Sequence, residues 1–231
     1  MTDKPVLTLR DLSIEFPTPA GVVKAVKNLD LTIQKGRRVG FIGESGSGKT
    51  TTALAVMQML AEPGRISGGT IDLAGTDVLS LSEEQMRQTR LSRIAYIPRG
   101  AMNSLNPVMR IEPQMWDGII AHEGHLDRAT LKRRSDEALT SVGLPVHTAD
   151  LYPHELSGGM KQRVCIAMGI ILNPDLIIAD EPTSALDVVT QRQVMQTLKD
   201  IQKKIGSGPV SYTHLRAHET ILPISYAVFC L

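Results

Sequence analysis

The sequence is poor in cysteine and aromatic residues and has no long apolar run. Cys165 and Cys230 are its only cysteines, and their spacing fits neither a metal site nor a disulfide framework, so we expect a reducing compartment. No stretch of about 18 uninterrupted apolar residues is present, so we expect no membrane-spanning helix. Residues 1–16 contain an early acid and no apolar core segment, and they do not predict a signal peptide.

Charge of one sign is not in excess either. The chain has 25 Lys and Arg residues against 24 Asp and Glu, for a formal net charge of +1. This balance gives no reason to expect an acidic partner surface, and we expect no nucleic acid. Hydrophobic residues make up 42% of the 231 residues, which predicts one soluble globular domain with room for two lobes.

Short apolar segments alternate with helical patterns along the chain. Residues 6–16 and 29–33 alternate apolar and polar side chains, which predicts strands with one buried face. Residues 38–60 have the pattern of an apolar strand, a glycine-rich turn and a helix. Residues 174–180 form a second apolar run, and residues 188–204 have an amphipathic helix pattern. Buried strands that alternate with helices favour an α/β fold with a mainly parallel sheet.

The middle of the chain is polar and has helical periodicity. It runs from Ser82 to about Leu144, and a loop rich in Pro, Gly and Asn interrupts it at residues 98–109. Residues 127–139 carry several charges, which we interpret as the solvated face of an amphipathic helix; a basic binding patch is the alternative.

A glycine-rich segment, GESGSGKT at residues 43–50, matches the phosphate-loop pattern G-x-x-x-x-G-K-[ST] between a strand and a helix. Glycines let the backbone wrap around an anion, and the N–H groups at the helix start point at phosphate oxygens. Lys49 would bind the β- and γ-phosphates and Thr50 would be a Mg²⁺ ligand; the alternative is a turn without function. The expected nucleotide-binding residues of this loop are Gly43, Glu44, Ser45, Gly46, Ser47, Gly48, Lys49, Thr50 and Thr51.

A pair of acids ends the second apolar run, in the segment LIIADE. Asp180 at the strand tip would hold the metal and its water shell, and Glu181 would orient or deprotonate the attacking water. The alternative is an acid pair that only caps the next helix. Its place after a strand, far downstream of a phosphate loop, favours the catalytic interpretation.

Two further motifs accompany the phosphate loop and the acid pair. LSGGM at residues 156–160 and SALD at residues 184–187 follow in an order that resembles the ATP-binding-cassette (ABC) ATPase family. The resemblance implies an α/β P-loop NTPase with a RecA-like core, an antiparallel β subdomain and an inserted α-helical subdomain. It places the cassette at residues 1–208 and the helical subdomain at about residues 82–160.

The same resemblance implies a head-to-tail dimer with two ATP molecules between the subunits. Ser157 and the N–H groups of Gly158 and Gly159 would contact the γ-phosphate bound by the partner. Asp187 lies in the family's D-loop and is expected to help bind the nucleotide. Phe16, one of few aromatics, is the candidate for stacking on adenine; the alternative is that it is simply a buried strand residue.

One position departs from the family pattern. Arg99 stands where the family carries a glutamine that contacts the metal and the attacking water. Arginine neither accepts a hydrogen bond nor ligates a cation, so we expect it to slow hydrolysis and to uncouple it from a partner. A Gln-to-Arg change needs one nucleotide, so a chance mutation or a sequencing error is the alternative.

Further segments resemble the ATPase subunits of bacterial importers for dipeptides, oligopeptides and nickel, above all SLNPVMRI at residues 104–111. The resemblance implies ATP and Mg²⁺ as cofactors. The implied partners are a second ABC subunit, membrane permease subunits and, indirectly, an extracytoplasmic substrate-binding protein. The implied location is the cytoplasmic face of the inner membrane. The alternatives are a soluble cassette ATPase without a permease and an inert truncated fragment.

The last residues resemble translated sequencing-adapter DNA. Back-translation of VSYTHLRAHET and ISYAVFCL gives two halves of a transposase-library read-through adapter, in order and in frame. We therefore expect residues 209–231 to be a non-native tail on a C-terminally truncated cassette, which would leave the expressed chain prone to aggregate. His214 stands where the family carries its switch histidine, and this origin leaves it out of the site.

Overall fold

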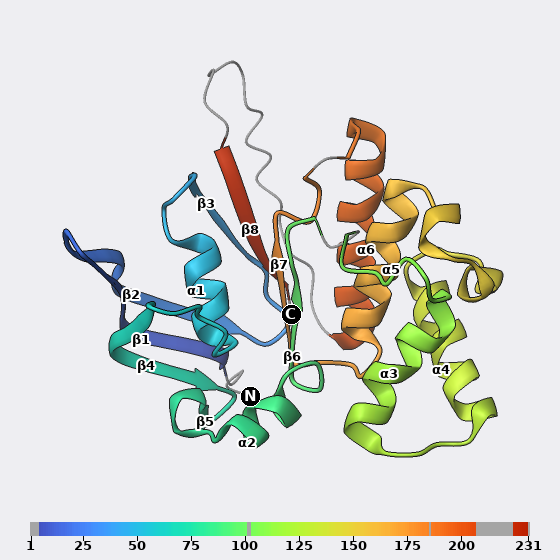
Figure 1. The fold of residues 1–231 in the computed structure, drawn as a ribbon, viewed down its shortest axis with the longest axis horizontal. Helices are drawn as coiled ribbons and strands as arrows, with labels where there is room; N and C mark the ends of the chain where they lie inside the picture. The colour runs from blue at the N-terminus through green and yellow to red at the C-terminus, as the bar shows by residue number, and fades with distance from the viewer. Residues whose placement is uncertain (1–4, 101–102, 185, 207–223, 231) are drawn as a thin grey trace.

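Two sheets and a group of helices make up the part of the chain that the computed structural model describes, residues 5–100, 103–184, 186–206 and 224–230 (Figure 1). One sheet has the strand order β2-β1-β4-β5 and the other the order β3-β8-β7-β6. The strands are β1 (Pro5–Thr18), β2 (Gly21–Gln34), β3 (Val39–Glu44), β4 (Arg65–Leu73), β5 (Thr76–Asp77), β6 (Ile94–Ile97), β7 (Leu176–Asp180) and β8 (Ile224–Cys230). The α-helices are α1 (Lys49–Val56), α2 (Glu83–Thr89), α3 (Ile111–Glu123), α4 (Arg128–Ser141), α5 (Gly158–Ile170) and α6 (Val188–Gly206). Short 3-10 turns lie at Val78–Ser80, Val146–Asp150 and Pro153–Glu155.

The first sheet is antiparallel throughout. β1 pairs with both β2 and β4, so that Leu9 lies opposite Leu31 on one side and Ile71 on the other. Leu9 and Ile71 are buried, and Ala53 and Val56 of α1 join the same core. The alternation predicted for residues 6–16 therefore yields the expected antiparallel β subdomain.

The second sheet carries the two nucleotide motifs at its strand ends. β6 and β7 are parallel, with Ile97 opposite Ala179. Every residue of β7 is buried, because Ile178 faces the core beneath the first sheet and Ile177 faces the core of the helical lobe. A strand covered on both faces requires a continuous apolar run, which is what the sequence has at residues 174–180.

Strand direction in this sheet departs from the prediction of a mainly parallel sheet. β8 lies between β3 and β7 and runs antiparallel to both, whereas β6 and β7 are parallel. Three strands thus share one direction and β8 opposes them. The rest of the segment predicted to be a non-native tail, residues 209–223 and 231 with His214, lies outside the described residues.

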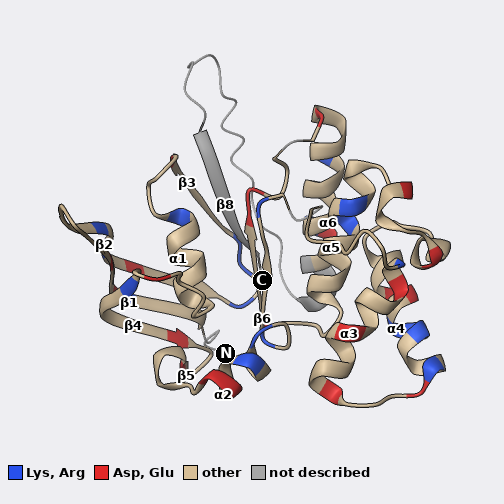
Figure 2. Ribbon diagram, in the orientation of Figure 1, with Lys and Arg blue, Asp and Glu red and all other residues tan. Residues whose placement is uncertain are grey.

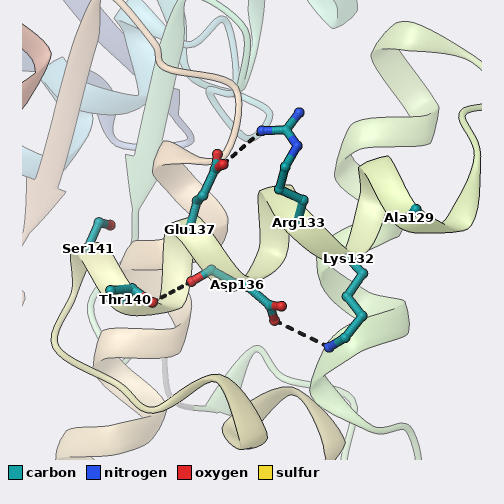
Figure 3. A pocket seen from close by; sticks show the side chains of 7 residues that line it. All are labelled: Ala129, Lys132, Arg133, Asp136, Glu137, Thr140 and Ser141. Carbon is teal, nitrogen blue, oxygen red and sulfur yellow. Dashed lines mark hydrogen bonds and ion pairs between the residues drawn. The ribbon is translucent and has the colours of Figure 1, made fainter.

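The helices α3, α4 and α5 form the second lobe around one apolar core (Figure 1). In α4 the buried side chains are Leu131, Ser135, Ala138 and Leu139. The opposite face, shown in Figure 3, pairs Arg133 with Glu137 at 2.7 Å and Lys132 with Asp136 at 3.4 Å. Figure 2 shows both signs of charge mixed across this lobe, so the charged side chains of residues 127–139 lie on a solvated helix face, as predicted. Within the described ranges, every helix is too short or too polar to cross a membrane.

Helix α1 is shorter than the sequence predicts. It ends at Val56 rather than near residue 60, because Gln58 adopts a φ of 48°, in the left-handed region. The N–H of Met59 then bonds the carbonyl oxygen of Leu54 at 2.8 Å, and that of Gln58 bonds Ala55 at 3.0 Å. This is a Schellman termination, which usually has glycine where Gln58 stands and is for that reason hard to predict from sequence.

Candidate nucleotide-binding site

The phosphate loop connects β3 to α1, and Lys49 forms hydrogen bonds to three of its residues. The Nζ atom of Lys49 lies 2.9 Å from the carbonyl oxygen of Gly43, 2.7 Å from that of Glu44 and 2.8 Å from the Oγ of Ser47. Lys49 is only 8% exposed. A buried ammonium group is costly unless acceptors surround it. These three oxygens accept its hydrogen bonds and so stabilise the Lys49 side chain inside the loop.

Two glycines permit the curvature of this loop. Gly48, the N-cap of α1, has a φ of 87°, and a Cβ there would lie 2.6 Å from the carbonyl oxygen of Ala25. A Cβ on Gly43 would lie 2.7 Å from the Oγ of Ser47. The N-terminus of α1 has no side-chain cap, so its N–H groups face the concave loop as donors for an anion.

Asp180 joins the phosphate loop to the second motif. Thr50 donates its hydroxyl to Oδ2 of Asp180 at 2.8 Å, and Tyr96 donates its phenol to the same oxygen at 3.2 Å. Asp180 is 3% exposed. Burial, and after it the charge of Asp180, raises the pKa of Tyr96 above its ordinary value, so the phenol stays a donor. A hydroxyl and a carboxylate oxygen side by side are ligands of the type that Mg²⁺ prefers.

Glu181 follows directly and is paired with Arg99. Its φ of 45° lies in the left-handed region, which turns the chain sharply after β7. The Nε of Arg99 lies 3.1 Å from Oε2 of Glu181, with side-chain exposures of 65% and 14% respectively. The family resemblance implied that Arg99 stands at a position that contacts a metal and the attacking water. In the structure Arg99 is paired with Glu181, the acid predicted to act on that water.

The LSGG motif begins α5, in the other lobe. Figure 1 shows α1 and α5 on opposite sides of β6 and β7, so the structure does not bring this motif to the phosphate loop of its own chain. Ser157 caps α5, with its Oγ accepting a hydrogen bond from the N–H of Met160 at 3.3 Å. Gly158 is the first residue of the helix. A Cβ on Gly159 would lie 2.3 Å from the Cγ2 of Thr190, so α5 and α6 meet closely here.

Asp187 caps α6 next to this contact. Its carboxylate accepts hydrogen bonds from the N–H groups of Val189 at 3.1 Å and Thr190 at 3.0 Å, and from the Thr190 hydroxyl at 2.5 Å. The hydrogen bond from the Thr190 hydroxyl is the main cause of the lowered pKa of Asp187. The D-loop acid therefore has a structural role, as a helix cap, besides the role predicted for it with nucleotide.

Phe16 packs against the turn at Gly64. A Cβ on Gly64 would lie 2.6 Å from Cε1 of the Phe16 ring, and the ring is partly buried against the core of the first sheet. Its cross-strand neighbour Val23 is 55% exposed. These contacts are those of a strand residue, the alternative interpretation, and stacking on adenine stays a prediction.

Sequence reasoning missed Tyr96. The tyrosine lies near the carboxyl end of β6, and its hydroxyl reaches the acid at the end of the neighbouring strand β7. The carboxyl ends of parallel strands gather at one edge of a sheet, where ligands bind. The sequence predicted helical periodicity for residues 82–144, so the strand end that carries Tyr96 was not predicted.

Comparison with known proteins decides the family. The family described as "ABC transporter" matches residues 26–184. The chain belongs to the ABC transporter family. This ABC cassette is 41% identical over 212 residues to the oligopeptide transport ATP-binding protein OppD of Bacillus subtilis, covering 90% of the chain and 59% of that protein. It is 38% identical over 217 residues to the dipeptide transport ATP-binding protein DppD of Lactococcus lactis, covering 93% and 62%.

Solved structures agree on the fold of this ABC cassette. A dimeric ATP-binding cassette in a post-hydrolysis state, bound to ADP and Pi, superposes with a TM-score of 0.72 at 27% identity, over 86% of this chain and 83% of that one. The predicted architecture is thus confirmed as an α/β nucleotide-binding cassette with an antiparallel β subdomain and a helical lobe. The chain spans 59% and 62% of the lengths of the two curated relatives.

Proposed function

We propose that this chain is part of the ATP-binding and ATP-hydrolysing subunit of a bacterial ABC importer for peptides. The observation that carries the proposal is the hydrogen bond of 2.8 Å between Thr50 and Asp180, which joins a phosphate loop to an acid-bearing strand. The relatives named as oligopeptide and dipeptide transport proteins support a peptide as the cargo. Nickel is the alternative cargo, because the sequence also resembles nickel importers.

ATP and Mg²⁺ fit the residues at the phosphate loop. Lys49 and the N–H groups of α1 would hold the phosphates, and Thr50 and Asp180 would hold the metal. Within the described residues, no group of three or more His, Cys, Asp or Glu side chains is placed to hold a metal ion. Mg²⁺ needs no such cage, because it usually binds one or two protein oxygens together with phosphate oxygens and water. When bound, the metal supplies positive charge to the phosphate chain.

Hydrolysis would use Glu181. Its carboxylate stands one residue after Asp180, where β7 ends, and it would orient a water molecule toward the γ-phosphorus. The water oxygen bonds to phosphorus, the bond to the β,γ-bridging oxygen breaks, and the water proton passes to Glu181. The products are ADP and inorganic phosphate.

A second cassette would complete each nucleotide site. The separate positions of α1 and α5 support this, because the two motifs lie on opposite sides of β6 and β7 within one chain. In a head-to-tail dimer, Ser157, Gly158 and Gly159 of one subunit would contact the γ-phosphate held by the other, with Asp187 close by. The dimeric cassette of similar fold gives the proposal a physical precedent.

The remaining partners follow from the peptide-transport relatives. We propose that the subunit docks on permease subunits at the cytoplasmic face of the inner membrane. An extracytoplasmic binding protein would deliver the peptide to that permease without contacting this chain. Closure of the ATP-bound dimer and its reopening after hydrolysis would drive the permease.

We also propose that residues 209–231 are not part of the natural protein and that the cassette occupies residues 1–208, with its helical subdomain at about 82–160. The adapter-like sequence supports this, and so does the direction of β8, which opposes strands on both sides. Ile42 in β3 is 65% exposed, which is unusual for the central apolar residue of such a strand. Site variants therefore belong in the full-length protein, recovered by sequencing the gene across codon 99 and beyond codon 205.

The function is tested by nucleotide binding and ADP formation in that full-length protein. Lys49→Ala should lose both, because the phosphates lose their buried cation. Glu181→Gln should still bind ATP but turn it over about a hundredfold more slowly. With the permease and the binding protein reconstituted, peptides should stimulate hydrolysis and nickel should not. Absence of ADP formation by the parent protein, or equal rates in the parent and Lys49→Ala, would contradict the proposal.

A further inference from the structure

The pairing of β6 with β7 fixes the position of Arg99. Ile97 lies opposite Ala179 in a parallel register. Arg99 and Glu181 each stand two residues beyond this pair, so they leave the sheet at the same edge. The ion pair of 3.1 Å between them is a consequence of strand register together with the side chain at position 99.

The chemistry of the pair bears on hydrolysis. A guanidinium has five N–H donors and no acceptor, so it can bind the Glu181 carboxylate but cannot receive a hydrogen bond from water. Arg99 contacts Oε2 of Glu181. This atom is one of the two carboxylate oxygens of Glu181, either of which could accept the proton of the attacking water. Glu181 is 14% exposed and Arg99 65%, so the arginine reaches a largely covered carboxylate from the solvent side.

We propose that Arg99 is a positioning residue that holds Glu181 away from water in the resting site and thereby slows basal hydrolysis. This inference rests on the proposed function, because it assigns a restraint to the same acid. An ion pair with one exposed partner is weak and is screened by salt. The restraint is therefore modest and can be released by raising the ionic strength.

The first test compares ATP turnover in the full-length protein and its Arg99→Gln variant. Arg99→Gln should raise kcat about two- to fivefold, the range that such a pair supplies, with KM for ATP nearly unchanged. Arg99→Lys keeps the charge and should stay near the parent rate. Arg87→Gln is the matched control, because Arg87 forms an exposed pair of 2.7 Å with Glu84 on α2 and should leave the rate unchanged.

Salt gives a readout that a merely structural role would not produce. At saturating ATP, the parent rate should rise between low salt and about 0.5 M, where the Debye length is only a few ångströms, and approach that of Arg99→Gln. The Arg99→Gln rate should stay flat over the same range. A parent rate that falls in parallel with the variant would overturn the proposal.

A second measurement does not depend on turnover. Urea unfolding of the nucleotide-free parent, Arg99→Gln, Glu181→Gln and the double variant forms a double-mutant cycle, and a favourable coupling between the two positions is expected. Zero coupling, equal non-zero kcat in parent and Arg99→Gln, or a gene that encodes glutamine at codon 99 each overturn the proposal. Failure of the proposed function looks different, because then no variant forms ADP, and the restraint falls with it.

Discussion

The hydroxyl of Thr50 and the carboxylate of Asp180 lie 2.8 Å apart, although 130 residues separate them in the chain. Thr50 is fixed by the first turn of α1, and Asp180 by the last position of β7. The same carboxylate oxygen also accepts the Tyr96 phenol. Two neutral donors on a buried carboxylate leave its negative charge uncompensated by them, which suits a site for a divalent cation.

Metal dependence is the first property that this arrangement predicts. Asp180→Asn should raise the Mg²⁺ concentration for half-maximal ATP turnover by at least about tenfold, because a neutral amide oxygen is a weaker ligand than a carboxylate. Thr50→Ala should act in the same direction. The measurement is a Mg²⁺ titration of ADP formation at fixed ATP.

The control for this titration is Thr197→Ala, which removes an exposed hydroxyl on α6 that bonds only within its helix. It should leave the Mg²⁺ requirement unchanged. If Asp180→Asn and Thr197→Ala gave the same titration curve, Asp180 would not be a metal ligand.

Tyr96 provides the second prediction. Tyr96→Phe removes the phenol that bonds Asp180 at 3.2 Å and should lower the free energy of unfolding by about 1.5 kcal/mol, as expected for a partly buried bond to a charged group. The Mg²⁺ requirement should rise, but by less than in Asp180→Asn, because the ligand itself remains. Urea unfolding and the same titration measure the two effects.

The raised pKa of Tyr96 adds a dependence on pH. Burial and the charge of Asp180 keep the phenol protonated in the folded chain above the pH at which an unfolded tyrosine, with a pKa of 10.0, loses its proton. The unfolded state then binds fewer protons than the folded state, so stability falls as the pH rises above about 10. Tyr96→Phe should show a shallower loss than the parent over this range. Parallel curves would mean that the phenol is not shielded.

The phosphate loop, the acid pair and most of the strands and helices could be predicted from the sequence, because each depends on local backbone demands; β6 was not, since it lies in a segment with a helical pattern. Glycine stands at position 48 because the φ there is 87°, and β7 is an apolar run because both of its faces are covered. The contacts of Arg99 and Tyr96 could not be predicted in this way. They depend on the register between two strands that lie 79 or more residues apart in sequence, with Ile97 opposite Ala179 and Ile94 opposite Leu176.

The end of α1 and the exposure of Ile42 could not be predicted from local sequence patterns, for different reasons. Gln58 ends α1 in a conformation usually taken by glycine, so its residue type did not predict the end of the helix. Ile42 is 65% exposed although the pattern at residues 38–43 predicts a buried strand. Burial depends on what covers a face, and a strand's own sequence does not contain that information.

The tail yields the fourth prediction. The 231-residue chain, expressed as it stands, should form aggregates and show no appreciable ATP turnover, because the β3 face at Ile42 is exposed and, as proposed above, residues 209–231 are not native. Light scattering and size-exclusion chromatography, together with an ADP assay, measure this, with the full-length protein as the control. A soluble product that unfolds cooperatively and hydrolyses ATP would contradict it.

The contact between Gly159 and Thr190 supports the last prediction. A Cβ on Gly159 would lie 2.3 Å from the Cγ2 of Thr190, a distance at which either the Thr190 side chain or the two helices must shift. Gly159→Ala should therefore lower the free energy of unfolding by about 1–3 kcal/mol, the usual cost of overpacking. Thr190→Ser removes the methyl group while keeping the hydroxyl that bonds Asp187, so it should restore much of the loss in a double variant. Urea unfolding of the two single variants and the double variant measures this; equal loss with and without Thr190→Ser would mean that the cost of the alanine arises elsewhere.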